Sequence, residues 1–389
     1  MERIVLAYSG GLDTSVAVSW LAETRGAEVV TLTLDLGQSR ELDAIRERAL
    51  AAGAVNAHVL DVRAEFASDY VLPALQAGAI SEGGDPLATA LSRPLMAKKL
   101  VEIARIEGAR SIAHGCTGRG HDHVRIEVSS RAIDPSIGVM APAREWSMSR
   151  SDEVDYARRR GIPVPATQTR PHKTDVNLWG RSIACDVLED PWAEPPAEAF
   201  TLTADPSVCP DEPASLEIEF LRGTPVAVNG VPMPLLELID SVTTIAGSHG
   251  VGRIDTVENR LIGIRLRDVY EAPAAVVLHA AHRELEGFVC PRGLARVKRG
   301  LALEYADLVD NGLWHSPLRS AIDAFVADVQ QRVTGIVRLK LFKGSCRVVG
   351  RQSAFAPHEC ALAGGEGDVA DHLAAAGLIN TVVPTRTEP

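Results

Sequence analysis

The residues best suited to chemistry lie near the N-terminus, in the run Ala7-Tyr8-Ser9-Gly10-Gly11-Leu12-Asp13-Thr14-Ser15. This run follows the apolar residues 4–6, which predict a buried strand, and precedes residues 16–21, which predict a helix. A helix N-terminus behind a glycine-rich turn points free backbone N–H groups outward and binds anions. The glycines permit close approach of phosphate oxygens, and the serine and threonine hydroxyls add donors. Residues 7–15 therefore predict a phosphate-binding loop.

The composition of this loop narrows the kind of phosphate site. A Walker A loop requires a lysine near its end, and residues 7–15 contain none. The glycine spacing of dinucleotide-binding folds is absent too. The order Ser-Gly-Gly-x-Asp-Thr resembles the pyrophosphatase loop of the N-type ATP pyrophosphatases, which implies cleavage of ATP between its α- and β-phosphates. An ordinary glycine-rich turn between strand and helix is the alternative.

A second polar cluster occupies residues 114–127 and contains three glycines. Asp122 and Arg125 fall one helical turn apart, on one face of a predicted helix. A carboxylate can hold a substrate ammonium group and a guanidinium can bind a carboxylate, so the pair suits an amino-acid substrate. A solvated ion pair is the simpler alternative. The run His121-Asp122-His123 converges only in an extended segment, and no matching Cys or His cluster exists elsewhere, so no metal site is predicted.

Alternating strand and helix patterns must position both clusters. The sequence predicts strands at 4–8, 29–35, 57–61, 111–115 and 138–141, and helices at 14–23, 41–52, 65–75, 94–107 and 151–160. This alternation predicts a parallel, doubly wound α/β sheet that binds a nucleotide. Because ligands of such sheets bind at the carboxyl ends of strands, both clusters are in suitable places.

The later part of the sequence predicts an α+β domain. Its patterns indicate hairpins at 215–228 and 335–349 and amphipathic helices at 294–309 and 316–333. A last helix, at 369–378, suits docking on another subunit. We divide the chain into an ATP-binding domain (1–165), a synthetase domain (166–362) and an oligomerisation tail (363–389).

Composition argues against several classes of protein. The chain has 389 residues and a net charge of −11, which disfavours a broad nucleic-acid-binding surface. Its six cysteines form no C-x-x-C pair, as expected for free thiols in a reducing compartment. The N-terminus does not have the pattern of a signal peptide, and no apolar run is long enough to span a membrane. A cytoplasmic location is expected.

Together the two clusters resemble argininosuccinate synthases, and the resemblance covers roughly residues 3–355. It continues through Gly37-Gln38, Thr89-Ala90-Leu91-Ser92-Arg93-Pro94 and Asp175-x-Asn177-Leu178-Trp179-Gly180-Arg181-Ser182. Further matches are His249-Gly250-Val251-Gly252-Arg253-Ile254-Asp255, Glu258-Asn259-Arg260, Tyr270-Glu271-Ala272-Pro273-Ala274 and Leu313-Trp314-His315-Ser316-Pro317. These motifs are specific because they recur in order along most of the chain.

The resemblance implies an ATP-dependent ligase that adenylates the ureido oxygen of citrulline and condenses the product with aspartate. It implies ATP and Mg²⁺ as co-substrate and cofactor, and a homotetramer. The implied ATP contacts are residues 7–15 with Leu34 and Gly115. Thr117 and Asp122 would hold aspartate. The implied acceptor positions are Asp85, Thr89, His121, Arg125, Lys173, Ser182, Glu258 and Tyr270. We name Asp13, Arg93 and Asp122 as catalytic candidates.

Three acceptor positions depart from the family pattern. Asp85 replaces a tyrosine, His121 an asparagine and Lys173 a serine. Asp85 and Lys173 suit a salt bridge that would reshape the pocket. Other departures are Leu34 for alanine, His123 for glutamine and Ser81 for tyrosine. We therefore keep a second hypothesis, that a different ureido or carbonyl acceptor is used. A tRNA-modifying adenylating enzyme and a non-catalytic nucleotide-binding regulator are the hypotheses from other classes.

Overall fold

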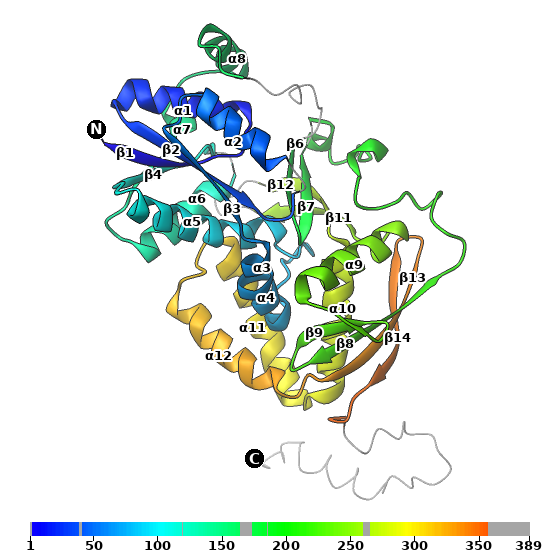
Figure 1. Ribbon diagram of the computed structural model, residues 1–389. Coiled ribbons are helices and arrows are strands. Elements are labelled where there is room, and N and C mark those ends of the chain that lie inside the picture. The colour runs from blue at the N-terminus through cyan, green and yellow to red at the C-terminus, as the bar shows by residue number, and fades with distance from the viewer. Residues whose placement is uncertain are drawn as a thin grey trace, which may run out of the picture.

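The computed structural model describes residues 2–38, 41–118, 120–163, 173–184, 186–259 and 265–356 (Figure 1). These residues form three sheets with helices packed around them. The predicted tail and its helix at 369–378 fall outside the described residues. Within the described residues, no helix is both long and apolar enough to cross a membrane.

The first sheet has the strand order β3-β2-β1-β4-β5, and every neighbouring pair is parallel. All five strands predicted for this region are confirmed. After β3 the chain crosses to the other side of β1 to form β4, so the carboxyl ends of β1 and β4 meet where the strand order reverses. That is where such sheets bind ligands. The strands are β1 (Arg3–Ala7), β2 (Glu28–Asp35), β3 (Asn56–Asp61), β4 (Ser111–Ala113) and β5 (Gly138–Met140).

Helices cover both faces of this sheet, which confirms the doubly wound arrangement (Figure 1). Ile4 and Leu6 pack on one face with residues of α1, α2 and α8. Val5 points to the other face, among residues of α5 and α6. This alternation follows from the two-residue period of a strand. The helices are α1 (Leu12–Arg25), α2 (Leu42–Ala51), α5 (Ala88–Ile106), α6 (Asp122–Ile133), α7 (Pro142–Glu145) and α8 (Arg150–Arg159).

Two helix boundaries differ from prediction, and both involve proline. Helix α5 begins at Ala88, so the predicted start at Pro94 was wrong and Pro94 lies inside the helix. The predicted helix at 65–75 is instead α3 (Arg63–Phe66), a π-helical turn (Ala67–Val71) and α4 (Leu72–Ala77). Pro73 cannot donate to the carbonyl four residues earlier, and the wider π turn accommodates that break.

The second half contains a sheet of order β10-β9-β8-β13-β14, in which every neighbouring pair is antiparallel. Both predicted hairpins are confirmed, and their turns, Arg222-Gly223 and Lys343-Gly344, have positive φ at both residues. The strands are β8 (Ala214–Leu221), β9 (Thr224–Val228), β10 (Val231–Pro232), β13 (Gly335–Phe342) and β14 (Ser345–Gln352). The helices are α9 (Leu235–Ser248), α10 (Pro273–Val289), α11 (Arg292–Asp310) and α12 (Pro317–Gln330), of which α11 and α12 were predicted.

A third, antiparallel sheet of order β11-β12-β7-β6 was not predicted. Its strands are rich in charged residues, so they lack the apolar alternation that identifies a half-buried strand. They are β6 (Lys173–Asn177), β7 (Gly180–Ala184), β11 (Arg253–Asn259) and β12 (Arg265–Glu271), with short 3-10 turns at Asp186–Glu189 and Ala197–Ala199 between sheets.

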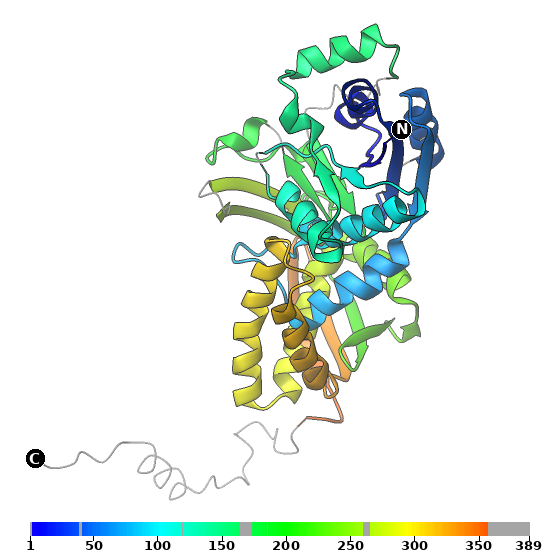
Figure 2. The same cartoon turned by 90° about the vertical axis from the view of Figure 1, so that its left-hand side faces the viewer.

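The two halves share one core. Helix α4, from the first half of the sequence, lies across α11 and α12 of the second half (Figure 2). Apolar residues from both halves belong to a single buried cluster that includes Leu75, Leu91, Leu216 and Leu278. The segment that links β3 to α5 is therefore packed against the second half.

Candidate active site

The loop between β1 and α1 lies at the carboxyl end of the central strand. Gly10 has a φ of +76°, which favours glycine. The hydroxyl oxygens of Ser9 and Thr14 lie 3.2 Å apart. The Ser15 hydroxyl is fully buried and donates to the Gly11 carbonyl at 2.8 Å. Ser15 therefore supports the loop from inside, and the hydroxyl donor expected there is turned away from solvent.

Three other loop residues contribute mainly backbone. Tyr8 and Leu12 are buried in the core formed by β1, α1 and α2, and Ala7 ends β1. The Tyr8 hydroxyl lies 2.8 Å from the Ser15 hydroxyl. Any contact that Tyr8 or Leu12 makes with a nucleotide must therefore come through its main chain.

Asp13 faces helix α8, which begins beside the loop. Its carboxylate pairs with Arg150, whose guanidinium also lies 3.3 Å from Glu153. Arg150 thus holds the carboxyl groups of Asp13 and Glu153 near each other. Burial, followed by the Asp13 charge, raises the pKa of Glu153 to about 7.

Replacing Glu153 with glutamine should stabilise the protein at pH 8 and much less at pH 5. Because its folded-state pKa is raised, Glu153 contributes stability at low pH that is lost as pH rises from about 4.5 to about 7. Glutamine does not titrate and escapes this loss. Thermal unfolding of Glu153→Gln and wild type at both pH values measures the effect, with Asp155→Asn, exposed on the same helix, as the control. An equal shift in Tm at both pH values would contradict the prediction.

The segment after β4, which carries the second predicted cluster, contacts the loop at 7–15, which forms the first. A Cβ built on Gly115 would lie 2.9 Å from Thr14 Cγ2, so only glycine fits there without a shift. Buried His114 accepts from the Cys116 N–H through Nδ1 at 3.3 Å and shapes this turn. Thr117 is exposed on the same turn. Leu34, at the end of β2, is buried.

A pocket of about 150 Å³ lies next to these segments, where the first and third sheets meet. It brings together most of the predicted substrate positions. Thr117 is not among the lining residues, and neither is any residue of the loop at 7–15. The pocket is lined by Asp85, Thr89, Ala90, Gly120, His121, Asp122, Arg125, Asp175, Ser182, Glu258, Asp268 and Tyr270.

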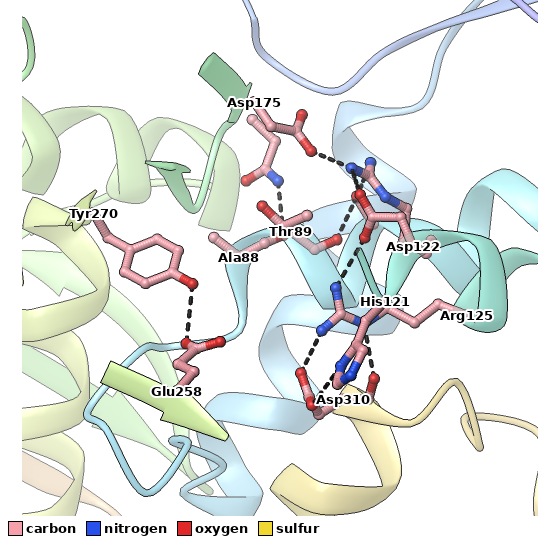
Figure 3. Close-up of polar contacts among 12 residues, drawn as sticks. Ala88, Thr89, His121, Asp122, Arg125, Asp175, Glu258, Tyr270 and Asp310 are labelled. Atoms are coloured by element: carbon pink, nitrogen blue, oxygen red, sulfur yellow. Dashed lines mark hydrogen bonds and ion pairs between the residues drawn. The ribbon is translucent and has the colours of Figure 1, made fainter. Parts of the chain in front are cut away.

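One wall of the pocket is a network of ion pairs (Figure 3). Asp122 accepts from both Arg93 and Arg125, each at 2.8 Å. The second Arg93 partner is Asp175. Arg125 donates further to the carbonyl of Asp310 at 2.8 Å and pairs with its carboxylate. The predicted placement of Asp122 and Arg125, one turn apart on α6, is thus confirmed.

This network fixes the charge state of its members. Burial alone would raise the pKa of Asp122, but the two guanidinium groups outweigh it and hold the pKa well below its usual range. Burial opposes the charge of Arg93, yet Asp122 and Asp175 raise its pKa well above the ordinary value. Asp122 is therefore a carboxylate at all physiological pH values and a weak acceptor of protons.

Two members of the network, Asp175 and Asp310, were not among the predicted site residues. Asp175 belongs to the motif at 175–182, and this motif could have identified it as a candidate site residue. Asp310 ends α11 in a stretch without any motif, and only the fold brings it to the pocket. Its carboxylate also lies 3.3 Å from Nδ1 of His121, which caps the start of α6.

The opposite wall comes from the third sheet. The Tyr270 hydroxyl donates to Glu258 at 3.0 Å across β12 and β11 (Figure 3). Ser182 pairs in register with Tyr270 on the neighbouring strand. Lys173 begins β6, but its side chain falls outside the described part of the chain, and with it the predicted Asp85–Lys173 salt bridge.

The β6–β7 turn holds in place the loop that carries Asp85 and the start of α5, which carries Thr89. Asn177 donates to the Ala88 carbonyl at 2.7 Å, and the Trp179 indole donates to the Pro86 carbonyl at 3.1 Å. Both side chains are buried. Leu87 between these anchors has a φ of +61°, an unfavourable conformation for a leucine that the surrounding contacts maintain.

Asp85 is the most unusual acid of the pocket. It is 6% exposed, and its carboxyl accepts from the Leu87 N–H. Burial, then the charge of Glu258, raises the pKa of Asp85 to about 8. The side chain is therefore mostly neutral at pH 7, in contrast to Asp122, which lines the same pocket.

Nearly the whole chain matches two known domain models. Residues 3–163 match the arginosuccinate synthase N-terminal HUP domain, and residues 172–385 match the arginosuccinate synthase C-terminal domain. The chain belongs to the argininosuccinate synthase family. It is therefore an enzyme of the ligase class, and membership implies the use of ATP. In this chain, the residues that match the HUP domain form the parallel sheet and the loop that follows β1.

Curated relatives support the assignment along nearly the full chain. The argininosuccinate synthase of Symbiobacterium thermophilum is 53% identical over 388 residues, 99% of this chain and 97% of that protein. That of Geobacillus thermodenitrificans is 52% identical over 386 residues, 99% of this chain and 95% of that protein. The Gloeobacter violaceus protein is 51% identical, with 99% and 98% covered.

Metal binding by protein side chains alone finds no support in the part of the chain that is described. No group of three or more His, Cys, Asp or Glu side chains there is arranged to hold a metal ion. The His121-Asp122-His123 run forms the cap and first turn of α6, with Asp122 committed to two arginines.

Proposed function

We propose that this enzyme joins citrulline to aspartate and forms argininosuccinate, AMP and pyrophosphate. The observation that carries the proposal is that one segment joins the two clusters: it contacts the phosphate-binding loop where Gly115 meets Thr14, and it continues to Gly120 and Asp122 of the amino-acid pocket. Roughly half of the sequence is identical to that of argininosuccinate synthases over almost the whole length, which supports the family's own acceptor over a different one.

The proposed chemistry has two bond-forming steps. The ureido oxygen of citrulline attacks the α-phosphorus of ATP, and the bond to the β-phosphate breaks to release pyrophosphate. The amine of aspartate then attacks the activated ureido carbon, loses a proton, and expels AMP. Each step develops negative charge on phosphate oxygens, which preorganised N–H donors of the loop at 7–15 stabilise.

The chain's residues suggest a division of labour. Asp122, held ionised by Arg93 and Arg125, suits an ammonium group of aspartate better than the task of a general base. Arg125 has three of its N–H groups on protein oxygens and two left for a substrate carboxylate. Glu258 and Tyr270 lie across the pocket, where the amino-acid end of citrulline would bind.

Mg²⁺ fits the loop as a partner of the phosphates. Asp13 offers a partly exposed carboxylate beside the loop, and carboxylate oxygens are the protein ligands that Mg²⁺ accepts. When bound, the ion would neutralise charge on the triphosphate. Arg150 and Glu153 keep the Asp13 carboxylate in place.

Citrulline-dependent and aspartate-dependent formation of AMP and pyrophosphate from ATP tests the function. Citrulline labelled with ¹⁸O in the ureido group should transfer the label to AMP. Absence of AMP formation with citrulline would refute the proposal. The homotetramer implied by the resemblance stays a prediction, which light scattering of the full chain tests.

Replacing Gly10 with alanine should lower kcat/KM for ATP by about a hundredfold, because a loop shift of about 1 Å is enough to misplace the phosphates. A Cβ there would meet Arg48 at 3.0 Å and Ile45 at 3.1 Å, at a φ of +76°. Gly26→Ala is the matched control, since Gly26 also has positive φ (+60°) but nothing within 4 Å. Equal kinetics of the two variants would contradict the proposed role of the loop.

A further inference from the structure

The pocket contains one buried carboxyl oxygen that the protein leaves unsatisfied. Oδ1 of Asp85 has no hydrogen-bond partner, although the side chain is 94% buried and lines the pocket. Burying a polar oxygen without a partner costs about 1–3 kcal/mol. The fold nevertheless maintains this arrangement, with Asn177 and Trp179 anchoring the residues just after Asp85. A ligand group that donates a hydrogen bond is the missing partner.

The charges around Asp85 select the type of donor. Glu258 on β11 and Asp310 at the end of α11 raise the pKa of Asp85, and Arg125 on α6 lowers it. Arg125 is already paired with Asp122 and Asp310. The remaining titratable groups that line the pocket are His121, Asp122, Asp175, Asp268 and Tyr270. A cationic donor is therefore favoured over a neutral one.

We propose that Asp85 and Glu258 together bind the α-ammonium group of the amino-acid acceptor, and that Asp85 gives up its proton when the ammonium binds. This inference rests on the proposed function, because it takes citrulline as the acceptor. The neutral Asp85 carboxyl becomes a carboxylate paired with the ammonium, and one proton passes to solvent. No other bond forms or breaks.

The physical reason is the cost of two neighbouring carboxylates. With the pocket empty of a cation, Glu258 and Asp85 cannot both be ionised cheaply, so Asp85 keeps its proton. An ammonium group between them satisfies both charges and the bare Oδ1 oxygen. An acceptor whose amine is acylated has no such charge and leaves the cost in place. Asp85 thereby makes the pocket select free α-amino acids.

Isothermal titration calorimetry of citrulline measures the proton directly. The holoenzyme mixture contains α,β-methylene-ATP, which cannot be cleaved, and each titration is run in phosphate and in Tris at pH 7. Wild type should release close to one proton, and its Kd for citrulline should fall by about fiftyfold between pH 6 and pH 8, because the ionised fraction of a group with a pKa of about 8 rises by that factor. Asp85→Asn should release none and show a flat profile. Nα-acetylcitrulline should not bind wild type measurably.

Glu82→Gln is the matched control, because Glu82 is an exposed acid in the same loop and its substitution makes the same change of charge. It should behave as wild type. If Asp85→Asn does not fold, the pH profile and the acetylated analogue still decide the question in wild type. AMP formation with citrulline, but no proton release and no pH dependence, would overturn the inference and leave the function intact. Absence of both citrulline binding and AMP formation would remove both.

Discussion

Replacing Arg93 with alanine should reduce kcat/KM by on the order of a hundredfold or more and lower the free energy of unfolding by about 3 kcal/mol. Arg93 is 9% exposed and holds Asp122 and Asp175 together. Without it the two carboxylates repel each other beside the pocket, and the pKa of Asp122 rises because one of its two cations is lost. Steady-state kinetics and urea denaturation measure the two effects.

The control for Arg93 lies on the same helix. Arg105 pairs with Asp134 at 3.2 Å on the exposed side of α5, so Arg105→Ala should change the free energy of unfolding by less than about 1 kcal/mol. Arg93→Lys keeps the charge but cannot reach both carboxylates with a planar fork, and we expect it to restore stability more than activity. An active, stable Arg93→Ala enzyme would show that the network does not organise the pocket.

Replacing Glu271 with alanine should lower the free energy of unfolding by about 3–5 kcal/mol. Glu271 is fully buried at the end of β12 and accepts from the backbone N–H groups of Thr201, Leu202 and Thr203 at 2.9–3.0 Å. It also pairs with buried Arg181 at 2.6 Å. Its removal leaves a buried guanidinium and several N–H donors without partners. Because Arg181 and Glu271 adjoin Ser182 and Tyr270, activity should fall as well.

Urea denaturation of Glu271→Ala and Glu271→Gln separates charge from shape. The glutamine keeps one acceptor oxygen but presents an NH₂ group to donors, so an intermediate loss is expected. Glu219→Ala, on the exposed side of β8, should be nearly neutral. A loss below about 1 kcal/mol in Glu271→Ala would mean that water replaces these contacts, and would contradict the role assigned to this network.

The sequence predicted the parallel sheet and both of its ligand-facing segments, because their signals are local. Apolar strands, the glycine turn and the spacing of Asp122 and Arg125 need only neighbouring residues to be recognised. The third sheet escaped because its strands carry site residues where apolar ones would be expected. Asp310 escaped because its contact with Arg125 spans 185 residues. The direction of the Ser15 hydroxyl depends on Tyr8 and Gly11, which no pattern encodes.

The altered residues Asp85 and His121 were identified as departures from the family pattern, but their effect depends on surroundings that the sequence does not reveal. His121 lies beside Asp310, and Asp85 lies close enough to Glu258 to feel its charge. The sequence predicted neither of these pairs. In the sequence, Asp85 only removes the ring of the family's tyrosine. In the structure, it is a buried acid whose pKa is raised by burial and by the charge of Glu258.

Helix α4 gives the molecule a mechanical property. The chain leaves the parallel sheet after β3, packs α4 against α11 and α12, and returns through the Asp85 loop to α5. A hinge opening between the halves would have to separate α4 from α11 and α12 or displace the Asp85 loop from the pocket. We therefore expect nucleotide and acceptor to bind and leave without a hinge opening between the two halves.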